Sequence, residues 1–180
     1  MSFIEIGVQP EIVKGLVKLG FESPTPVQEK VIPALLHGNG DWISLAQTGT
    51  GKTAAFGIPL IQKIDTSRKT TQALVLCPTR ELCVQVARDL ENFAKYLPEI
   101  KTLAVYGGAR IDTQINALRR GVHIIIATPG RLQDLMNRRA ADISGITTVV
   151  LDEADEMLNM GFQEEISSIL SETPAQKNTL

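Results

Sequence analysis

Short apolar runs alternate with longer amphipathic stretches along most of the chain, and this alternation limits the fold more than any other feature. Five runs have the composition of buried strands, at residues 42–45, 73–77, 102–106, 123–127 and 147–151. The stretches between them carry apolar residues at helical spacing. Strands that are apolar on both faces and separated by helices form right-handed βαβ units. The sequence therefore predicts one α/β domain over residues 1–180, built on a mostly parallel sheet with helices on both faces.

Helical spacing also marks the start of the chain, so residues 1–40 are expected to form a helical extension. Gly20 is placed to end a first helix, and Thr25 followed by Pro26 suits the N-cap and first position of a second. Gln28 lies three residues after Thr25, which satisfies the capping-box pattern. From the residues alone, helix capping is the better explanation of Gln28.

A glycine-rich loop follows the first apolar run and leads directly into a helix. Gly49 and Gly51 let backbone N–H groups approach a phosphate chain closely, and the helix N-terminus adds its dipole. Lys52 is placed to reach the outer phosphates, and Thr53 offers a hydroxyl to Mg²⁺. The segment matches the pattern G-x-x-x-x-G-K-[ST], except that Ala46 occupies its first position. The alternative is a glycine-rich turn beside an ordinary surface lysine, but the flanking strand and helix favour a nucleotide-phosphate site.

Polar or glycine-rich clusters follow each of the four later strands. They are Thr79-Arg80-Glu81, Gly107-Gly108, Thr128-Pro129-Gly130-Arg131 and Asp152-Glu153. Ligands of open parallel sheets bind beyond the carboxyl ends of the strands, so these clusters and the phosphate loop are expected at one edge. Judged singly, the threonines and glycines are explained equally well by capping and turn chemistry. Their convergence on one edge is the stronger indication of function.

Asp152 and Glu153 close the last apolar run. A carboxylate beside the phosphate loop can orient Mg²⁺, usually through water, and Glu153 could polarise an attacking water. Strict alternation along a strand would point the two side chains to opposite faces, so the backbone is expected to turn at Glu153. The alternative is that these acids, with Asp155 and Glu156, only favour the N-terminus of the next helix. The presence of Lys52 earlier in the chain favours the metal site.

Composition narrows the class of partner. The net charge is −2 and aromatic residues make up 4% of the chain, which argues against binding nucleic acid by bulk attraction or a stacking platform. Any such binding is expected from a few placed groups and helix dipoles.

The sequence predicts a cytosolic protein. It has no membrane-spanning run or secretory start, and Cys77 and Cys83 are suited to buried positions. A new apolar run beginning at Leu180 suggests a longer protein.

Taken together, the clusters spell a known set of motifs. In order, they are Gln28 with the upstream Phe21, Ala46-Gln47-Thr48-Gly49-Thr50-Gly51-Lys52-Thr53, Pro78-Thr79-Arg80-Glu81-Leu82, Gly107-Gly108, Thr128-Pro129-Gly130-Arg131-Leu132 and Asp152-Glu153-Ala154-Asp155. The chain closely resembles the first RecA-like domain of DEAD-box ATP-dependent RNA helicases. The likeness covers almost the whole chain and also accounts for Ala46 at the start of the loop.

The resemblance implies an ATP site in which Gln28 reads the adenine edge and Phe21 packs near the base, replacing the capping interpretation. The loop residues Gln47, Thr48, Gly49, Thr50 and Gly51 would bind ATP together with Lys52 and Thr53. It further implies that Asp152 and Thr53 hold Mg²⁺ and that Glu153 acts on the catalytic water.

The resemblance also implies RNA as a partner, bound through phosphate and sugar rather than through base sequence. The residues implied are Thr79, Arg80, Gly107, Gly108, Thr128, Pro129, Gly130 and Arg131. Asp155 would couple the site to a Ser-Ala-Thr motif beyond Leu180, where a second RecA-like domain with arginine fingers is also expected. An arginine finger contributes ~10³–10⁵ in rate, so residues 1–180 alone are expected to hydrolyse ATP very poorly.

Two other functions compete with RNA unwinding. An ATP-switched RNA clamp that holds partners would use the same motifs. A small-molecule kinase would need a dedicated substrate pocket or lid, and the sequence offers no segment of that kind.

Overall fold

The computed structural model describes residues 1–38, 40–45 and 49–180. Helices in these ranges are α1 (Pro10–Lys18), α2 (Pro26–His37), α3 (Lys52–Gln62), α4 (Arg80–Phe93), α5 (Ile111–Arg119), α6 (Pro129–Asn137), α7 (Ala154–Asn159) and α8 (Gln163–Glu172). Strands are β1 (Ala73–Leu76), β2 (Thr102–Val105), β3 (Ile124–Ala127), β4 (Thr148–Leu151) and β5 (Asn178–Thr179). No helix of the described ranges is long and apolar enough to cross a membrane.

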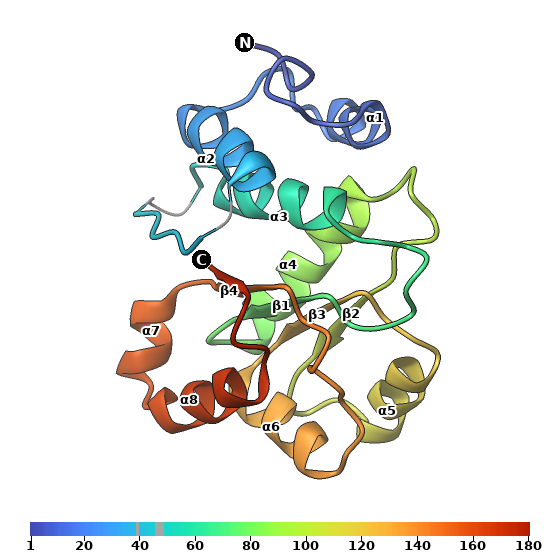
Figure 1. Ribbon diagram of the computed structural model, residues 1–180, viewed down its shortest axis with the longest axis vertical. Coiled ribbons are helices and arrows are strands. Elements are labelled where there is room, and N and C mark those ends of the chain that lie inside the picture. The colour runs from blue at the N-terminus through green and yellow to red at the C-terminus, as the bar shows by residue number, and fades with distance from the viewer. Residues whose placement is uncertain (39, 46–48) are drawn as a thin grey trace.

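The strands form one sheet in the order β2-β3-β1-β4-β5, and every pairing in it is parallel. Alternate residues of the central strand β1 enter two separate cores, Val75 on one face and Leu74 on the other. The first core packs against α1 to α4, and the second packs against α5 to α8. Figure 1 shows α1, α2 and α3 on one side of the sheet and α5, α6 and α8 on the other. The predicted parallel sheet with helices on both faces is confirmed.

The end of the first helix and the start of the second lie where the sequence predicts. Gly20 follows the C-cap of α1 with a φ of +85°, and Thr25 is the N-cap of α2 with Pro26 as its first residue. Cys77 and Cys83 are fully buried free thiols, also as expected. Burial raises the pKa of Cys83 to about 11 and that of Cys77 further, so both stay protonated at neutral pH.

The strand expected at residues 42–45 is absent, and this prediction is wrong. Residues 41–45 are irregular, and Ile43 and Leu45 are 92% and 97% exposed. The segment runs beside β5, where the N–H of Trp42 donates to the carbonyl of Thr179 over 2.8 Å. Because β5 has only two residues, it offers too short a ladder to hold a further edge strand. The pairing of β5 with β4 was not anticipated either, since residues 178–179 are polar.

Candidate active site

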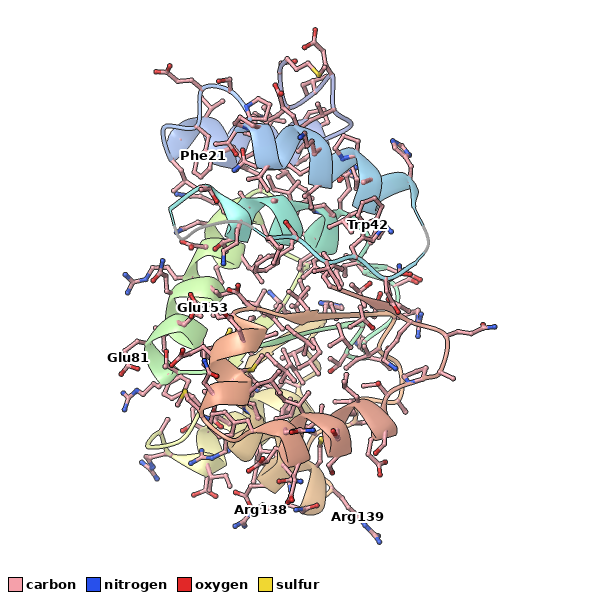
Figure 2. The ribbon with its side chains drawn as sticks, turned by 90° about the vertical axis from the view of Figure 1, so that its left-hand side faces the viewer. Phe21, Trp42, Glu81, Arg138, Arg139 and Glu153 are labelled. Atoms are coloured by element: carbon pink, nitrogen blue, oxygen red, sulfur yellow. The ribbon has the colours of Figure 1, made fainter. Side chains whose placement is uncertain are left out.

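The polar clusters after β1, β2, β3 and β4 lie at one edge of the sheet, because the four strands are parallel and adjacent. Thr79 caps α4 after β1, and Gly107-Gly108 forms a turn after β2. Thr128 is the N-cap of α6 after β3, and Glu153 is the N-cap of α7 after β4. In Figure 2, Glu153 and the Glu81 of the first turn of α4 lie on the same side of the molecule. Arg138 and Arg139 are exposed and project from another end of the molecule, away from Glu153.

The start of α3 has the backbone of an anion site. Gly49 and Gly51 have φ angles of +81° and +89°, in the left-handed region that glycine adopts without strain. A Cβ on Gly51 would collide with the side-chain amide of Gln28, so the loop also needs glycine for space. Lys52 and Thr53 are the first residues of α3, where unpaired N–H groups and the dipole favour negative charge. Residues 46–48, which include the predicted contacts of Gln47 and Thr48, lie outside the described residues.

Lys52 and Asp152 are brought together across the sheet edge, with Nζ of Lys52 3.8 Å from Oδ1 of Asp152. Burial raises the pKa of the Asp152 carboxyl above its ordinary value; Lys52 opposes this shift and the neighbouring Glu153 adds to it. The ammonium group of Lys52 therefore offsets only part of the cost of burying the ionised carboxylate of Asp152. A cation at this position would be favoured by the remaining charge.

Glu153 turns the chain out of β4. Its φ of 53° and ψ of 50° are left-handed, one of two such non-glycine residues in the described ranges, and the predicted turn at this position is confirmed. The turn brings both carboxylates to the same space, because Lys52, Asp152, Glu153 and Asp155 all line a cavity of about 1020 Å³. A phosphate chain at the start of α3 would lie next to both acids.

The oxygen groups at this edge fit Mg²⁺ bound with a phosphate ligand. The described residues hold no cluster of three His, Cys, Asp or Glu side chains, so a protein-only metal cage is not built there. Mg²⁺ commonly takes one or two protein oxygens and completes its shell with phosphate oxygens and water. The hydroxyl of Thr53 and the buried carboxylate of Asp152 are ligands of that kind.

Gln28 makes the capping contact predicted from its spacing and a second contact that was not predicted. Its side chain is fully buried; Oε1 accepts from the N–H of Thr25 over 3.0 Å, and Nε2 donates to the carbonyl of Gly51 over 3.1 Å. The hydroxyl of Thr25 donates to the carbonyl of Thr50 over 3.0 Å. These bonds tie the start of α2 to the glycine-rich loop before α3. Phe21 packs edge-on against Phe93, with ring centroids 6.0 Å apart.

The three segments expected to meet RNA contact one another. The guanidinium of Arg80 lies 5.0 Å from the ring centre of Tyr106, and its Nη1 lies close enough to Gly108 that a Cβ there would be 3.2 Å away. The N–H of Thr128 donates to the carbonyl of Val105 over 2.9 Å. Thr79 accepts from the N–H of Leu82, so its capping interpretation is confirmed. Pro129 is buried, whereas Gly130 and Asp155 are exposed.

One residue of this edge was missed from the sequence. Nη1 of Arg131 donates to the side-chain oxygen of Gln114, and Nε2 of Gln114 donates to the carbonyl of Tyr106. Gln114 stands among Ile111, Ile115 and Leu118, at a position of the α5 apolar stripe where a hydrophobic residue is expected. A polar residue that interrupts such a stripe is the signal that could have found it.

The comparisons with known proteins agree with this geometry. The family model described as DEAD/DEAH box helicase matches residues 25–180. An ATP-dependent RNA helicase CshA of Listeria monocytogenes is 51% identical over 179 residues, which is 99% of this chain and 34% of the relative. A DEAD-box ATP-dependent RNA helicase CshA of Geobacillus kaustophilus is 49% identical, over 99% of this chain and 38% of the relative. The chain thus spans about a third of the length of these relatives.

Solved structures give the same result. A DEAD box protein from Methanococcus jannaschii superposes with a TM-score of 0.91 and 38% identity, over 100% of this chain and 49% of that one. A variant of Dbp5 from S. cerevisiae, bound to RNA and ADP BeF3, superposes with a TM-score of 0.89 and 30% identity, over 99% and 45% of the two chains. The fold is RecA-like, as predicted, and the chain belongs to the DEAD/DEAH box helicase family.

Proposed function

We propose that residues 1–180 form a single RecA-like domain, with residues 1–40 as its helical extension, that binds ATP with Mg²⁺ and the RNA backbone. Joined to a second RecA-like domain, it hydrolyses ATP to drive local unwinding of RNA duplexes in the cytoplasm. The observation that carries this proposal is the shared cavity of Lys52, Asp152 and Glu153 at the start of α3. Named relatives that the chain matches are ATP-dependent RNA helicases, which supports the same function.

In this proposal, backbone N–H groups of residues 47–51 and the start of α3 surround the phosphates, and Lys52 pairs with the outer ones. Thr53 and Asp152 hold Mg²⁺, which when bound would neutralise charge on the phosphate oxygens. Glu153 accepts a hydrogen bond from the attacking water and orients it toward the outermost phosphate. Its turned backbone lets the carboxylate face the same cavity as Asp152.

RNA binding is proposed at the neighbouring ends of β1, β2 and β3. Thr79 and Arg80, Gly107 and Gly108, and the segment 128–131 offer backbone N–H groups, hydroxyls and guanidinium groups to phosphate and sugar oxygens. A chain with a net charge of −2 depends on such placed groups rather than on bulk attraction. Asp155, which lines the cavity, is proposed to couple the ATP site to the second domain.

Hydrolysis by the full-length protein tests the function. ATP turnover is expected to rise when single-stranded RNA is added, and a short labelled RNA duplex is expected to separate during turnover. Residues 1–180 alone are expected to be roughly 10³-fold slower or worse, because they lack the arginine fingers of the second domain. Turnover that ignores RNA would contradict the proposal. RNA-stimulated turnover without strand separation would instead indicate that the protein is an ATP-switched RNA clamp.

Gln28→Ala is expected to abolish the preference for ATP over GTP, because the side-chain amide can pair with the donor and acceptor of adenine. Since Gln28 is fully buried, adenine recognition requires the amide to leave at least one of its bonds to Thr25 and Gly51. The variant is also expected to lose about 1–3 kcal/mol of unfolding free energy, because Ala leaves the partners of both bonds unpaired.

Calorimetric titrations of the full-length protein with ATP and GTP measure this selectivity. Gln28→Glu is the matched control, because it keeps the acceptor for the N–H of Thr25 but removes the amide donor. Loss of selectivity in both variants is expected. If Gln28→Ala still prefers ATP, Gln28 is only a helix cap that anchors the loop.

A further inference from the structure

The turn after β2 is held by side chains from two other helices. From α5, Nε2 of Gln114 donates to the carbonyl of Tyr106 over 3.1 Å. From α6, Nη1 of Arg131 donates to the carbonyl of Ala109 over 3.2 Å. The same Nη1 lies 3.2 Å from Oε1 of Gln114, so the two side chains are joined to each other as well as to the turn. The bonds reach the turn at both its ends.

Packing alone does not explain why a glutamine occupies position 114. Its residue surface is only 4% exposed, although it carries an amide that is costly to bury. A leucine there would continue the apolar stripe of α5. Both ends of the amide are bonded, one to the turn and one to Arg131. The burial of this amide is therefore compensated through its contacts with the turn and with Arg131.

The turn needs such support, because its own residues cannot fix its shape. Gly107 and Gly108 are exposed and have no side chains, and Gly108 has a φ of +82°. A glycine-rich backbone loses more conformational entropy than any other when it is ordered around a ligand. Bonds that order it beforehand leave less entropy to be lost on binding.

We propose that Gln114 and Arg131 are a positioning pair that sets the Gly107-Gly108 backbone against the start of α6. The inference rests on the proposed binding of RNA at this edge and changes the expected role of Arg131. Nη1 of Arg131 is directed to Ala109 and Gln114, and the proposal therefore assigns the residue to supporting the backbone that meets the phosphates rather than to a phosphate contact of its own. The turn and the start of α6 then act as one preorganised surface.

Gln114→Met tests the pair, because methionine fills a similar space but offers neither bond. RNA affinity is measured by fluorescence anisotropy with a short labelled single-stranded RNA, using the full-length protein and a non-hydrolysable ATP analogue. The variant is expected to bind RNA roughly threefold to tenfold more weakly, as loss of such bonds implies. Its affinity for the analogue without RNA is expected to be unchanged. Asn116→Ala, on the exposed side of the same helix, is the matched control and is expected to match the wild type.

The salt dependence separates positioning from direct contact. Loss of one phosphate contact by a cation lowers the slope of log K against log salt by about 0.7 for single-stranded nucleic acid. Arg131→Met is expected to weaken binding as Gln114→Met does, with the slope unchanged in both. The double variant is expected to be no weaker than either single variant, because the two side chains act through one network. A slope that falls by about 0.7 in Arg131→Met would overturn the proposal.

Gln114→Glu provides a rescue that a purely structural role would not show. It restores the acceptor for Arg131 but not the donor to Tyr106, so its RNA affinity is expected to lie between those of Gln114→Met and the wild type. An affinity equal to wild type in a folded Gln114→Met, checked by thermal unfolding, would overturn the positioning pair alone. If Gln114→Met does not fold, the RNA affinities and salt slopes of Gln114→Glu and Arg131→Met test the positioning pair instead. Failure of the wild type to bind RNA would overturn the proposed function.

Discussion

Lys52→Ala is expected to weaken ATP binding by about a hundredfold or more, the largest effect of any single change in the nucleotide site. The ammonium group of Lys52 extends from the first residue of α3 into the cavity shared with Asp152 and Glu153. Alanine removes the cation that would pair with the outer phosphates. It also leaves the buried carboxylate of Asp152 without the cation that now lies 3.8 Å away, which adds to repulsion of a triphosphate.

Isothermal titration calorimetry with ATP and Mg²⁺ measures the loss. Lys63→Ala is the matched control, since Lys63 is the exposed C-cap of the same helix and lies far along α3 from the loop. The control removes the same charge from the chain and is expected to bind ATP as the wild type does. Retained affinity in Lys52→Ala would refute the assignment of the loop to phosphate.

Glu153→Gln is expected to lower ATP turnover by roughly 10²–10⁴ while nucleotide affinity stays within a few-fold of the wild type. The amide keeps the size of the side chain and its contacts but accepts the proton of an attacking water far less readily. Glu153 is half-buried at the end of β4, where the cavity gives it access to the same space as Lys52. Binding and chemistry are thus expected to separate at this residue.

Single-turnover hydrolysis and ATP titration of the full-length protein, both with RNA, measure the two quantities. Glu156→Gln is the control, because it removes an acid from the first turn of α7 without changing the N-cap. If the acids serve only the helix dipole, the two variants will behave alike. Normal turnover in Glu153→Gln would exclude it as the base.

The parallel sheet could be predicted because its central strands are apolar on both faces, a pattern that depends on the residues themselves. The edge strand β2 could also be predicted from its own residues, but the opposite edge beside β4 could not, because pairing there depends on the neighbouring strand. Residues 42–45 have a strand-like composition but lie beside a strand of two residues, whereas the polar residues 178–179 pair because β4 presents an open edge to them. Composition gives the preference of a residue for strand structure. At this edge, the length of the neighbouring strand decides whether such residues pair.

The site could be predicted as a set of clusters at one edge, but the bonds between clusters could not. Spacing correctly relates Gln28 to Thr25 within one helix turn. No local pattern relates Gln28 to Gly51, or Arg131 to Gln114, because those bonds join elements that only the tertiary fold brings together. The roles of these residues in binding remain predictions.

The left-handed backbone at Glu153 lowers the stability of the fold at the residue on which the proposed activity depends. An L-residue with a side chain gives up about 1–2 kcal/mol in that conformation, which glycine would recover and asparagine would partly recover. Selection for heat tolerance alone would therefore drive this position toward glycine or asparagine and discard the acid. A carboxylate persists there only in populations that are also screened for turnover.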